Sequence, residues 1–170
     1  MKKSVLLPIL FISIILIFII LTTGCTSIST HFTEIELMQM LNKLGEANVE
    51  GSAEKIVMYY TDPITEINHL SENTYVTTLE DKLLELEEMM IYVDCLIDDF
   101  SNEDITVLDA NNAIVEIDEH AKFQDLFEEG VFYESIDRVK LTLTKIEGAW
   151  KISIYELLSS QDVVSEYTFL

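Results

Sequence analysis

The chain has 170 residues and is strongly acidic, with 31 Asp and Glu against 10 Lys and Arg and a formal net charge of −21. This length predicts one main domain. The charge argues against a nucleic-acid partner, because phosphate backbones are bound by Lys and Arg. It also argues against electrostatic docking on an anionic membrane surface, and it favours cations and basic partners.

The N-terminus has the layout of a secretory signal. Lys2 and Lys3 precede a continuous apolar run over residues 5–21, and small residues lead to Gly24 and Cys25. Basic, apolar and small segments in that order are typical of an exported chain. Gly24-Cys25 resembles a lipobox, which implies a signal peptide over 1–24 and a diacylglyceryl thioether on Cys25. The usual Leu three residues before the Cys is replaced by Thr22.

An uncleaved membrane-spanning helix is the alternative, since the apolar run is close to the shortest length that crosses a bilayer. Both interpretations place residues 26–170 on the extracytoplasmic side of the cell membrane, because Lys2 and Lys3 stay inside. Residues 25–32 are then a tether and 33–170 the domain. Once Cys25 is assigned to the lipid, Cys95 is the one cysteine that remains, and a single cysteine cannot form an intramolecular disulfide. A helical apolar pattern around Cys95 predicts a buried thiol.

Three helices are predicted in the first half of the domain. The first begins at Thr33, where Thr33 and Glu36 fit a capping box, and ends near Gly51. A short second helix follows Ser52, carries Tyr59 and Tyr60, and ends at residues 62–63, since proline disfavours helix at the residue before it. Residues 64–70 alternate as a strand. A third helix spans about 79–92, with a capping box at residues 77–80.

Strands follow from about residue 105, where the apolar period changes from 3.6 to 2. The segments are 105–108, 113–117, 139–144 and 150–155, with Gly148 in a tight turn. We expect the inward positions of the last hairpin to be Val139, Leu141, Leu143, Trp150, Ile152 and Ile154. Helices followed by strands predict an α+β fold in which three N-terminal helices pack on an antiparallel sheet.

Two segments resemble nuclear-transport-factor-2-like domains, which include SnoaL-like cyclases and ketosteroid isomerases. The first is the break at Gly51 followed by MYYTDPITEI, and the second is the ending VKLTLTKIEGAWKISIYEL. The resemblance implies a curved sheet that encloses a cone-shaped pocket. Some members of this group catalyse isomerisation, dehydration or cyclisation, and others only bind ligands or partners, so the resemblance does not decide the function.

The candidate pocket residues are Tyr59, Tyr60, His69 and Trp150, with Asp62 in a turn beside them. None matches a catalytic motif, so no catalytic residue is assigned. The acidic segment 94–104 lacks the spacing and central glycine of a calcium-binding loop. No Cys/His cluster favours zinc, and no phosphate-binding loop is present in the sequence. The sequence therefore predicts neither a metal nor a cofactor.

Two main functions remain open, beside a purely structural role in an envelope assembly. The first is a membrane-anchored binding or interaction module whose apolar pocket holds a small molecule or a protein segment. The alternative is a small enzyme of the isomerase or cyclase kind that acts on an apolar substrate. An enzyme needs a buried Asp, Glu or His that faces a hydrogen-bond donor inside the cavity. Because the inward positions assigned above are all apolar, we expect binding without catalysis.

Overall fold

The structure is a computed structural model that describes residues 30–163. The chain divides into two units, Met1–Glu36 and Leu37–Leu170. The described part of the first unit is helical from residue 30, three residues before the predicted start at Thr33. The predicted signal peptide, Cys25 and most of the tether lie outside the described residues. Within residues 30–163, no helix is long and apolar enough to cross a membrane.

The first helix covers residues 30–50 and enters the second unit at Leu37. Its buried residues are spaced three and four apart, so they share one face: Leu37, Met40, Leu41, Leu44 and Ala47. Gly51 ends the helix with a φ of +67°, a conformation that favours glycine. The predicted end of the helix near Gly51 is confirmed.

The second predicted helix is wrong in its length. Helix α2 spans only Ala53–Val57, and strand β1, Tyr60–Asn68, begins where the helix was expected to continue. Tyr60 pairs with Ile152 of the last strand, and this sheet pairing replaces the helix. The register of β1 shifts between Tyr60 and Thr65, so Pro63 lies at an irregularity of the strand, where a missing N–H is tolerated.

Strand β2, Asn73–Thr77, pairs antiparallel with β1 and was not predicted. Helix α3, Leu79–Tyr92, has the predicted bounds. Its N-cap is Thr78, whose side chain accepts a hydrogen bond from the Asp81 N–H, so the predicted cap at Thr77 is wrong by one residue. The helix passes directly into the long strand β3.

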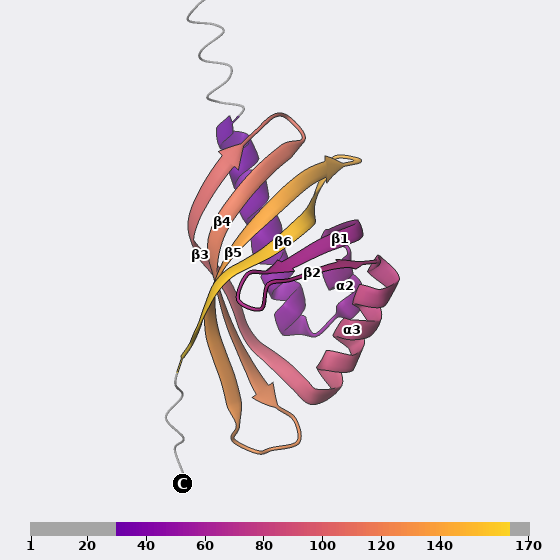
Figure 1. Cartoon of the computed structure of the whole chain (residues 1–170), viewed down its shortest axis with the longest axis vertical. Helices are drawn as coiled ribbons and strands as arrows, with labels where there is room; N and C mark the ends of the chain where they lie inside the picture. Colours follow the sequence, from indigo (N-terminus) through magenta and orange to yellow (C-terminus); the bar gives the residue numbers. More distant parts are fainter. Residues whose placement is uncertain (1–29, 164–170) are drawn as a thin grey trace, which may run out of the picture. The chain divides into compact units, whose positions relative to one another are not determined.

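Four long strands form most of the sheet: β3 (Val93–Val107), β4 (Asn112–Asp125), β5 (Phe132–Ile146) and β6 (Ala149–Asp162). The strand order is β2-β1-β6-β5-β4-β3. All neighbouring pairs are antiparallel except β1 and β6, which are parallel. In the second unit the sheet is curved, and the helices lie on its concave side (Figure 1). The predicted α+β architecture is confirmed.

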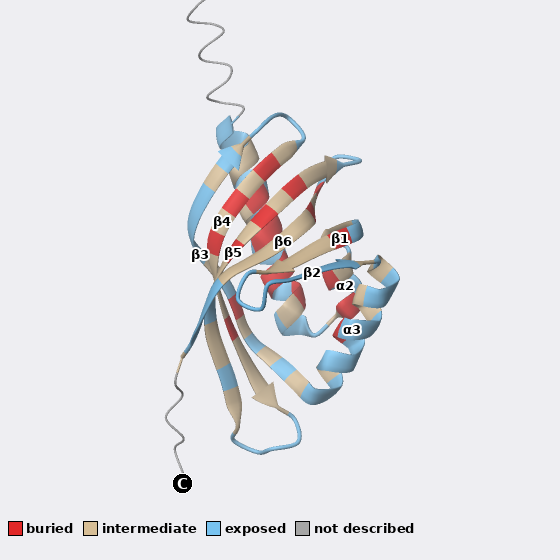
Figure 2. Cartoon of the chain, viewed as in Figure 1, coloured by how far each residue is buried: buried red, intermediate tan, exposed pale blue. Residues whose placement is uncertain are grey.

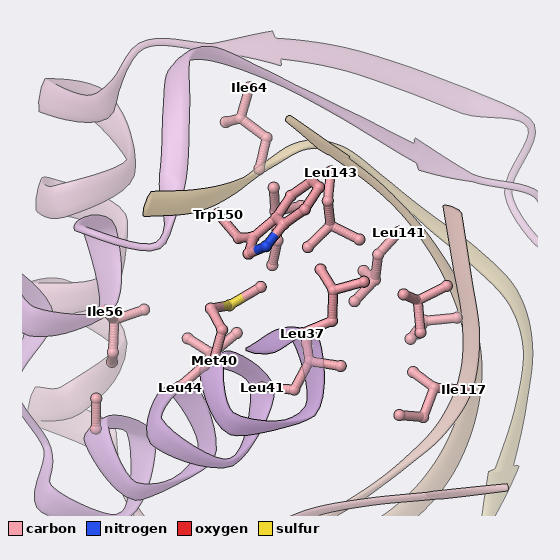
Figure 3. Close-up of a cluster of buried hydrophobic side chains, with 14 of the residues drawn as sticks. Leu37, Met40, Leu41, Leu44, Ile56, Ile64, Ile117, Leu141, Leu143 and Trp150 are labelled. Carbon is pink, nitrogen blue, oxygen red and sulfur yellow. The ribbon is translucent and has the colours of Figure 1, made fainter. Parts of the chain in front are cut away.

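The main core lies between the first helix and the central strands (Figures 2 and 3). Figure 3 shows Leu37, Leu41 and Leu44 facing Leu141, Leu143 and Ile117. Trp150 is 5 % exposed and packs in the same cluster, as predicted for an inward position. Ile56 of α2 and Ile64 of β1 extend this core toward α3.

Bulges change which face of a strand is buried. In β6 the pairing register shifts at Ser153: Ile152 pairs with Leu143, and Tyr155, not Ile154, pairs with the inward residue Leu141. Directly paired residues share a face of the sheet, so Tyr155 points inward. The expected inward position of Ile154 is therefore wrong, because one extra residue reverses the alternation beyond it.

Candidate functional site

A cavity of about 500 Å³ lies between helix α3 and the concave face of the sheet. One part of its wall is apolar and comes mainly from α3 and the end of β4: Leu86, Met89, Met90, Val93, Phe123 and Leu126. The opposite part is polar and is formed by Asn48, Tyr60, Asp98, Glu119 and Tyr155. This combination of an apolar wall with a few converging polar groups is typical of small-molecule sites.

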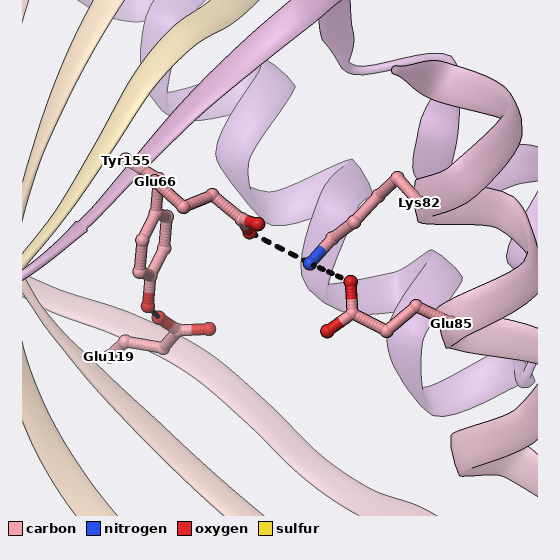
Figure 4. Close-up of polar contacts among 5 residues, drawn as sticks. All are labelled: Glu66, Lys82, Glu85, Glu119 and Tyr155. Carbon is pink, nitrogen blue, oxygen red and sulfur yellow. Dashed lines mark hydrogen bonds and ion pairs between the residues drawn. The ribbon is translucent and has the colours of Figure 1, made fainter. Parts of the chain in front are cut away.

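Glu119 is placed by the alternation of β4. Ala113, Val115 and Ile117 are fully buried, and Glu119 is the next residue on the same face. Its Oε2 accepts a hydrogen bond from the Tyr155 hydroxyl at 2.7 Å (Figure 4). Tyr155 reaches it from β6 because of the bulge at Ser153. A carboxyl thus occupies a position that would otherwise continue the apolar core.

Asp98 lies beside Glu119 on the neighbouring strand. The register of β3 shifts between Cys95 and Ile97, which turns Asp98 to the face that it shares with Ala121 of β4. Asp98 is 6 % exposed, and its Oδ2 accepts a hydrogen bond from the Asn48 side chain. Its Oδ1 is buried without a conventional hydrogen-bond donor.

Asp98 and Glu119, hereafter the carboxyl pair, lie within hydrogen-bond reach of each other. Two carboxylates at such a distance repel, so the pair is expected to retain a proton more readily than free carboxyls do. When Glu119 carries this proton, it can supply the donor that Asp98 lacks. The two carboxyls therefore titrate together.

Gly45 allows the first helix to approach this pair. A Cβ atom on Gly45 would overlap the backbone oxygen of Asp98, so a larger residue would push the helix away from β3. Asn48 lies one turn further along the same helix and donates to the Asp98 carboxylate. Close helix–strand packing at Gly45 therefore sets the position of the Asn48 amide.

Burial and mutual repulsion raise the pKa values in this cluster. Burial, followed by the charge of Asp98, raises the pKa of Glu119 to about 8, although the Tyr155 hydrogen bond acts in the opposite direction. Burial also raises the pKa of Asp98, against the hydrogen bonds from Asn48 and Glu119. The pKa values of Tyr155 and Tyr60 are raised by burial and then by the negative charge of Glu119. Such shifts mark candidate functional groups.

Lys82 is the basic residue among the described cavity-lining residues, and its charge is already matched. Its ammonium group lies 2.7 Å from Glu66 Oε1 and 3.2 Å from Glu85 Oε2 (Figure 4). Burial lowers the pKa of Lys82, but the hydrogen bonds and charges of these two carboxylates raise it on balance. Lys82 therefore stays charged and holds α3 to β1 across the cavity.

Cys95 lies in this site and not in a helix. It is on β3, half-buried, and it lines the cavity, so the helical assignment is wrong. Burial, followed by the charge of Asp98, raises the pKa of the thiol to about 12. A thiol with so high a pKa is a weak nucleophile, because the thiolate is the reactive form.

The predicted pocket residues are in different places. Tyr60 lines the cavity, whereas Tyr59 packs against the hydrophobic core and Trp150 lies within it. His69 is half-exposed beyond the end of β1, with its ring nitrogen 3.2 Å from Glu156. The Asp62 carboxylate accepts a hydrogen bond from the Leu79 N–H at the start of α3, on the surface. The structure does not bring these residues together.

Three main polar groups of the cavity, Asp98, Glu119 and Tyr155, were not predicted. Extending the 113–117 alternation by two residues would have placed Glu119 on the inward face. Asp98 and Tyr155 follow bulges, and the sequence pattern alone does not reveal an extra residue in a strand. Within residues 30–163, no group of three His, Cys, Asp or Glu side chains is placed to hold a metal ion.

Comparisons with solved structures identify the fold. The chain is similar to a candidate scytalone dehydratase from Novosphingobium aromaticivorans, with a TM-score of 0.68, 13% identity, and coverage of 83% of this chain and 94% of that one. A hexachlorocyclohexane dehydrochlorinase from Novosphingobium barchaimii is similar with a TM-score of 0.63 and 9% identity, and the match covers 85% of this chain and 99% of that one. A ketosteroid isomerase-like protein from Erwinia carotovora is similar with a TM-score of 0.56 and 12% identity, and the match covers 76% of this chain and 98% of that one.

These similarities show that the chain has the nuclear-transport-factor-2-like fold, as the two resembling segments implied. At such identities the similarity establishes the fold and not the activity. No family model matches the sequence. No curated protein matches it either.

Proposed function

We propose that the chain is a membrane-anchored, extracytoplasmic enzyme that transfers protons to and from a small molecule in the cavity. The observation that carries this proposal is the Glu119 carboxyl in the cavity wall, bonded to Tyr155 and paired with Asp98. The sequence left binding and catalysis open, and the requirement for catalysis was a buried acid that faces a donor inside the cavity. Glu119, which is partly buried in the cavity wall and faces the Tyr155 hydroxyl, is the acid that fits this description.

The proposed roles follow from burial and charge. Glu119 is the group that faces the ligand, and a pKa of about 8 lets it donate a proton when protonated and accept one when ionised. Asp98 lies more deeply and acts as a positioning residue whose charge raises the pKa of Glu119. Tyr155 orients the Glu119 carboxyl through its hydroxyl group.

The names of the similar structures agree with this chemistry. A dehydratase, a dehydrochlorinase and an isomerase all require that a proton be moved during the reaction. The apolar wall from α3 supports the alternative of a binding module without catalysis. The two functions differ in whether a ligand in the cavity is converted.

A chromogenic carbon acid tests this difference without knowledge of the natural substrate. 5-Nitrobenzisoxazole is flat and small enough for the cavity. Removal of its C3 proton by the Glu119 carboxylate breaks the C–H and N–O bonds and yields a nitrile and a coloured phenolate. We expect the full-length protein to accelerate this elimination above the buffer rate, with a rate that rises with pH through about 8, where Glu119 ionises.

Matched variants assign the activity to the cavity. Glu119→Gln should abolish the reaction, and Asp98→Asn should move the pH profile to lower pH, because the neighbouring charge is removed. Glu88→Gln removes an exposed carboxylate of α3 outside the cavity and should change nothing. An elimination rate that stays at the buffer level, or that survives Glu119→Gln in folded protein, would leave the binding module as the better function.

The anchoring part of the proposal rests on the basic start, the apolar run and Gly24-Cys25. Intact-mass analysis of membrane-extracted protein should show cleavage before Cys25 together with a diacylglyceryl group. Cys25→Ser should abolish both, since the thioether needs the thiol. An unmodified full-length mass would contradict the lipid anchor and favour the uncleaved helix.

A further inference from the structure

We infer that the cavity takes a small molecule that joins an apolar group to a protonated amine. This inference names the ligand class of the site under the proposed function, and it depends on that function only in treating the cavity as the binding site. It rests on the distribution of charge around the cavity, on an acceptor atom of Asp98 that lacks a donor, and on the apolar wall opposite the carboxyl pair.

The charge of the lining residues is strongly negative. Five of them are acids, namely Glu50, Glu66, Asp94, Asp98 and Glu119, and Lys82 is the base among the described ones. Lys82 is held by Glu66 and Glu85, and Glu50 is paired with Lys55 at 2.6 Å. The carboxyl pair therefore lies in a negative electrostatic potential, and no basic side chain among the described lining residues neutralises it as Lys82 neutralises Glu66.

Asp98 supplies the second observation, which is independent of the charge. The residue is 6 % exposed and lines the cavity, and its Oδ1 has no hydrogen-bond donor although it is buried. Protonated Glu119 can donate to Asp98, but once Glu119 is ionised this acceptor has no donor from the protein. Buried acceptors are normally satisfied, so a donor from a ligand is then the expected partner. An ammonium group provides both a positive charge and several N–H donors, and charge-assisted hydrogen bonds are stronger than neutral ones.

The opposite wall determines the remainder of the ligand. Met89, Met90, Phe123 and Leu126 present apolar surface to the cavity, and methionine side chains adapt to ligands of irregular shape. A cavity of about 500 Å³ accommodates a molecule of one ring with a short side chain. A carboxylate ligand is disfavoured, because its charge would lie among like charges in a poorly solvated space.

Three probes of similar shape and different charge test the inference: phenethylamine, 2-phenylethanol and 3-phenylpropionate. With full-length protein in detergent at pH 7, calorimetry should give a dissociation constant at least about tenfold lower for the amine than for the alcohol, and no measurable binding of the acid. Asp98→Asn should bring the amine and the alcohol to within about threefold of each other, whereas Glu88→Gln should keep the preference.

Proton release gives a second readout that needs no variant of Asp98. The charged and titratable groups that face Glu119 are Asp98 and Cys95 from β3, Asp137 from β5, Tyr155 from β6 and Tyr60 from β1. Lys82 of α3 is bonded both to Glu85 of the same helix and to Glu66 of β1. A bound ammonium adds positive charge to this group and favours ionised Glu119. Binding measured in two buffers of different ionisation enthalpy should therefore show release of up to about one proton, which Glu119→Gln removes.

The outcomes separate this inference from the proposed function. Equal or tighter binding of 2-phenylethanol, no binding of phenethylamine, or amine binding that is unchanged in folded Asp98→Asn protein would overturn the cationic ligand class. Elimination of 5-nitrobenzisoxazole that depends on Glu119 would still support the enzyme. Conversely, selective amine binding without any Glu119-dependent elimination would support the ligand class and contradict catalysis.

Discussion

The Tyr155 hydroxyl donates a 2.7 Å hydrogen bond to Glu119, and this contact joins strands β6 and β4 across the intervening strand β5 (Figure 4). Both side chains face the concave side of the sheet, where Leu141 of β5 pairs with Tyr155. A carboxyl in this position is surrounded by protein and lies next to a second carboxyl. Its acid–base behaviour is therefore set by burial and by Asp98, with Tyr155 as the moderating donor.

Tyr155→Phe tests the role of that donor. The hydroxyl stabilises ionised Glu119, so its removal should raise the pKa of Glu119 further and cost about 1 kcal/mol of unfolding free energy. Side-chain NMR titration and chemical denaturation measure the two effects. Tyr75→Phe, at an exposed position of β2, is the matched control and should change neither. A lower pKa in the Tyr155 variant would mean that the hydroxyl does not favour the ionised form.

Stability should decrease as the pH rises from about 4.5 to about 8. The pKa of Glu119 is near 4.5 in an unfolded chain and about 8 in the folded one. In this interval the unfolded state has lost a proton that the folded state retains, so the native state loses stability and the loss is complete above the folded pKa. We expect a decrease of up to about 5 kcal/mol, measured by denaturation at several pH values.

Glu119→Gln should flatten this dependence, because the amide does not titrate. Carboxyls whose pKa is lowered in the folded state, such as Asp118 and Glu134, act in a different interval. Their stabilisation is present above the unfolded pKa and is lost as the pH falls below about 4.5. A wild-type stability that increases steadily from pH 5 to pH 8 would show that Glu119 is not held protonated.

Gly45→Ala should disturb the site by displacing the first helix from β3. The added methyl group overlaps the Asp98 carbonyl, and overpacking of this kind costs about 1–3 kcal/mol. The displaced helix should also move Asn48 away from the Asp98 carboxylate and weaken ligand binding. Glu46→Ala, the next residue on the exposed face, is expected to leave the denaturation midpoint nearly unchanged. Equal midpoints for the two variants would contradict the close approach.

The bulge at Ser153 predicts that truncation of Ile152 and of Ile154 lowers the free energy of unfolding by very different amounts. Ile152 is fully buried, and Ile152→Ala should cost about 2–5 kcal/mol, as for other deletions of large core side chains. Ile154 pairs with Thr142 on the other face, so Ile154→Ala should cost less than about 1 kcal/mol. Urea denaturation of both variants measures the difference. A larger loss of stability for Ile154→Ala than for Ile152→Ala would contradict the bulge and would mean that the alternation continues through Ser153.

The sequence predicted the elements whose signals are local. The break at Gly51, the bounds of α3 and the alternation over residues 139–143 depend on neighbouring residues, and the structure confirms them. The alternation from Trp150 is confirmed as far as Ile152. The second helix was extended too far because Tyr60 pairs with Ile152, and the sequence does not show that long-range contact. Strand β2 was missed for the same reason, since its apolar content is small and its partner is β1.

The cavity was harder to predict than the fold. Tyr60 was predicted correctly as a residue that lines the cavity. The carboxyl pair was not predicted, for two physical reasons. Glu119 lies on the inward face of β4, two residues beyond the predicted end of this strand at residue 117, whereas the strand continues to Asp125. Asp98 and Tyr155 face inward only because single extra residues in β3 and β6 reverse the alternation. In so acidic a chain, the sequence does not distinguish a buried acid from an exposed one until the pairing register of β3 and β6 is known.

The pKa of Glu119 in the full-length protein is the most direct test of an acid–base site. Carbon-13 NMR of protein labelled at glutamate side-chain carboxyls, with the Glu119 signal identified by its loss in Glu119→Gln, follows its titration. We predict an apparent pKa of about 8, shifted down in Asp98→Asn because burial would then act without the neighbouring charge. A Glu119 signal that titrates near 4.5, as for an exposed carboxyl, would contradict the proposal that this residue is a proton donor and acceptor at neutral pH.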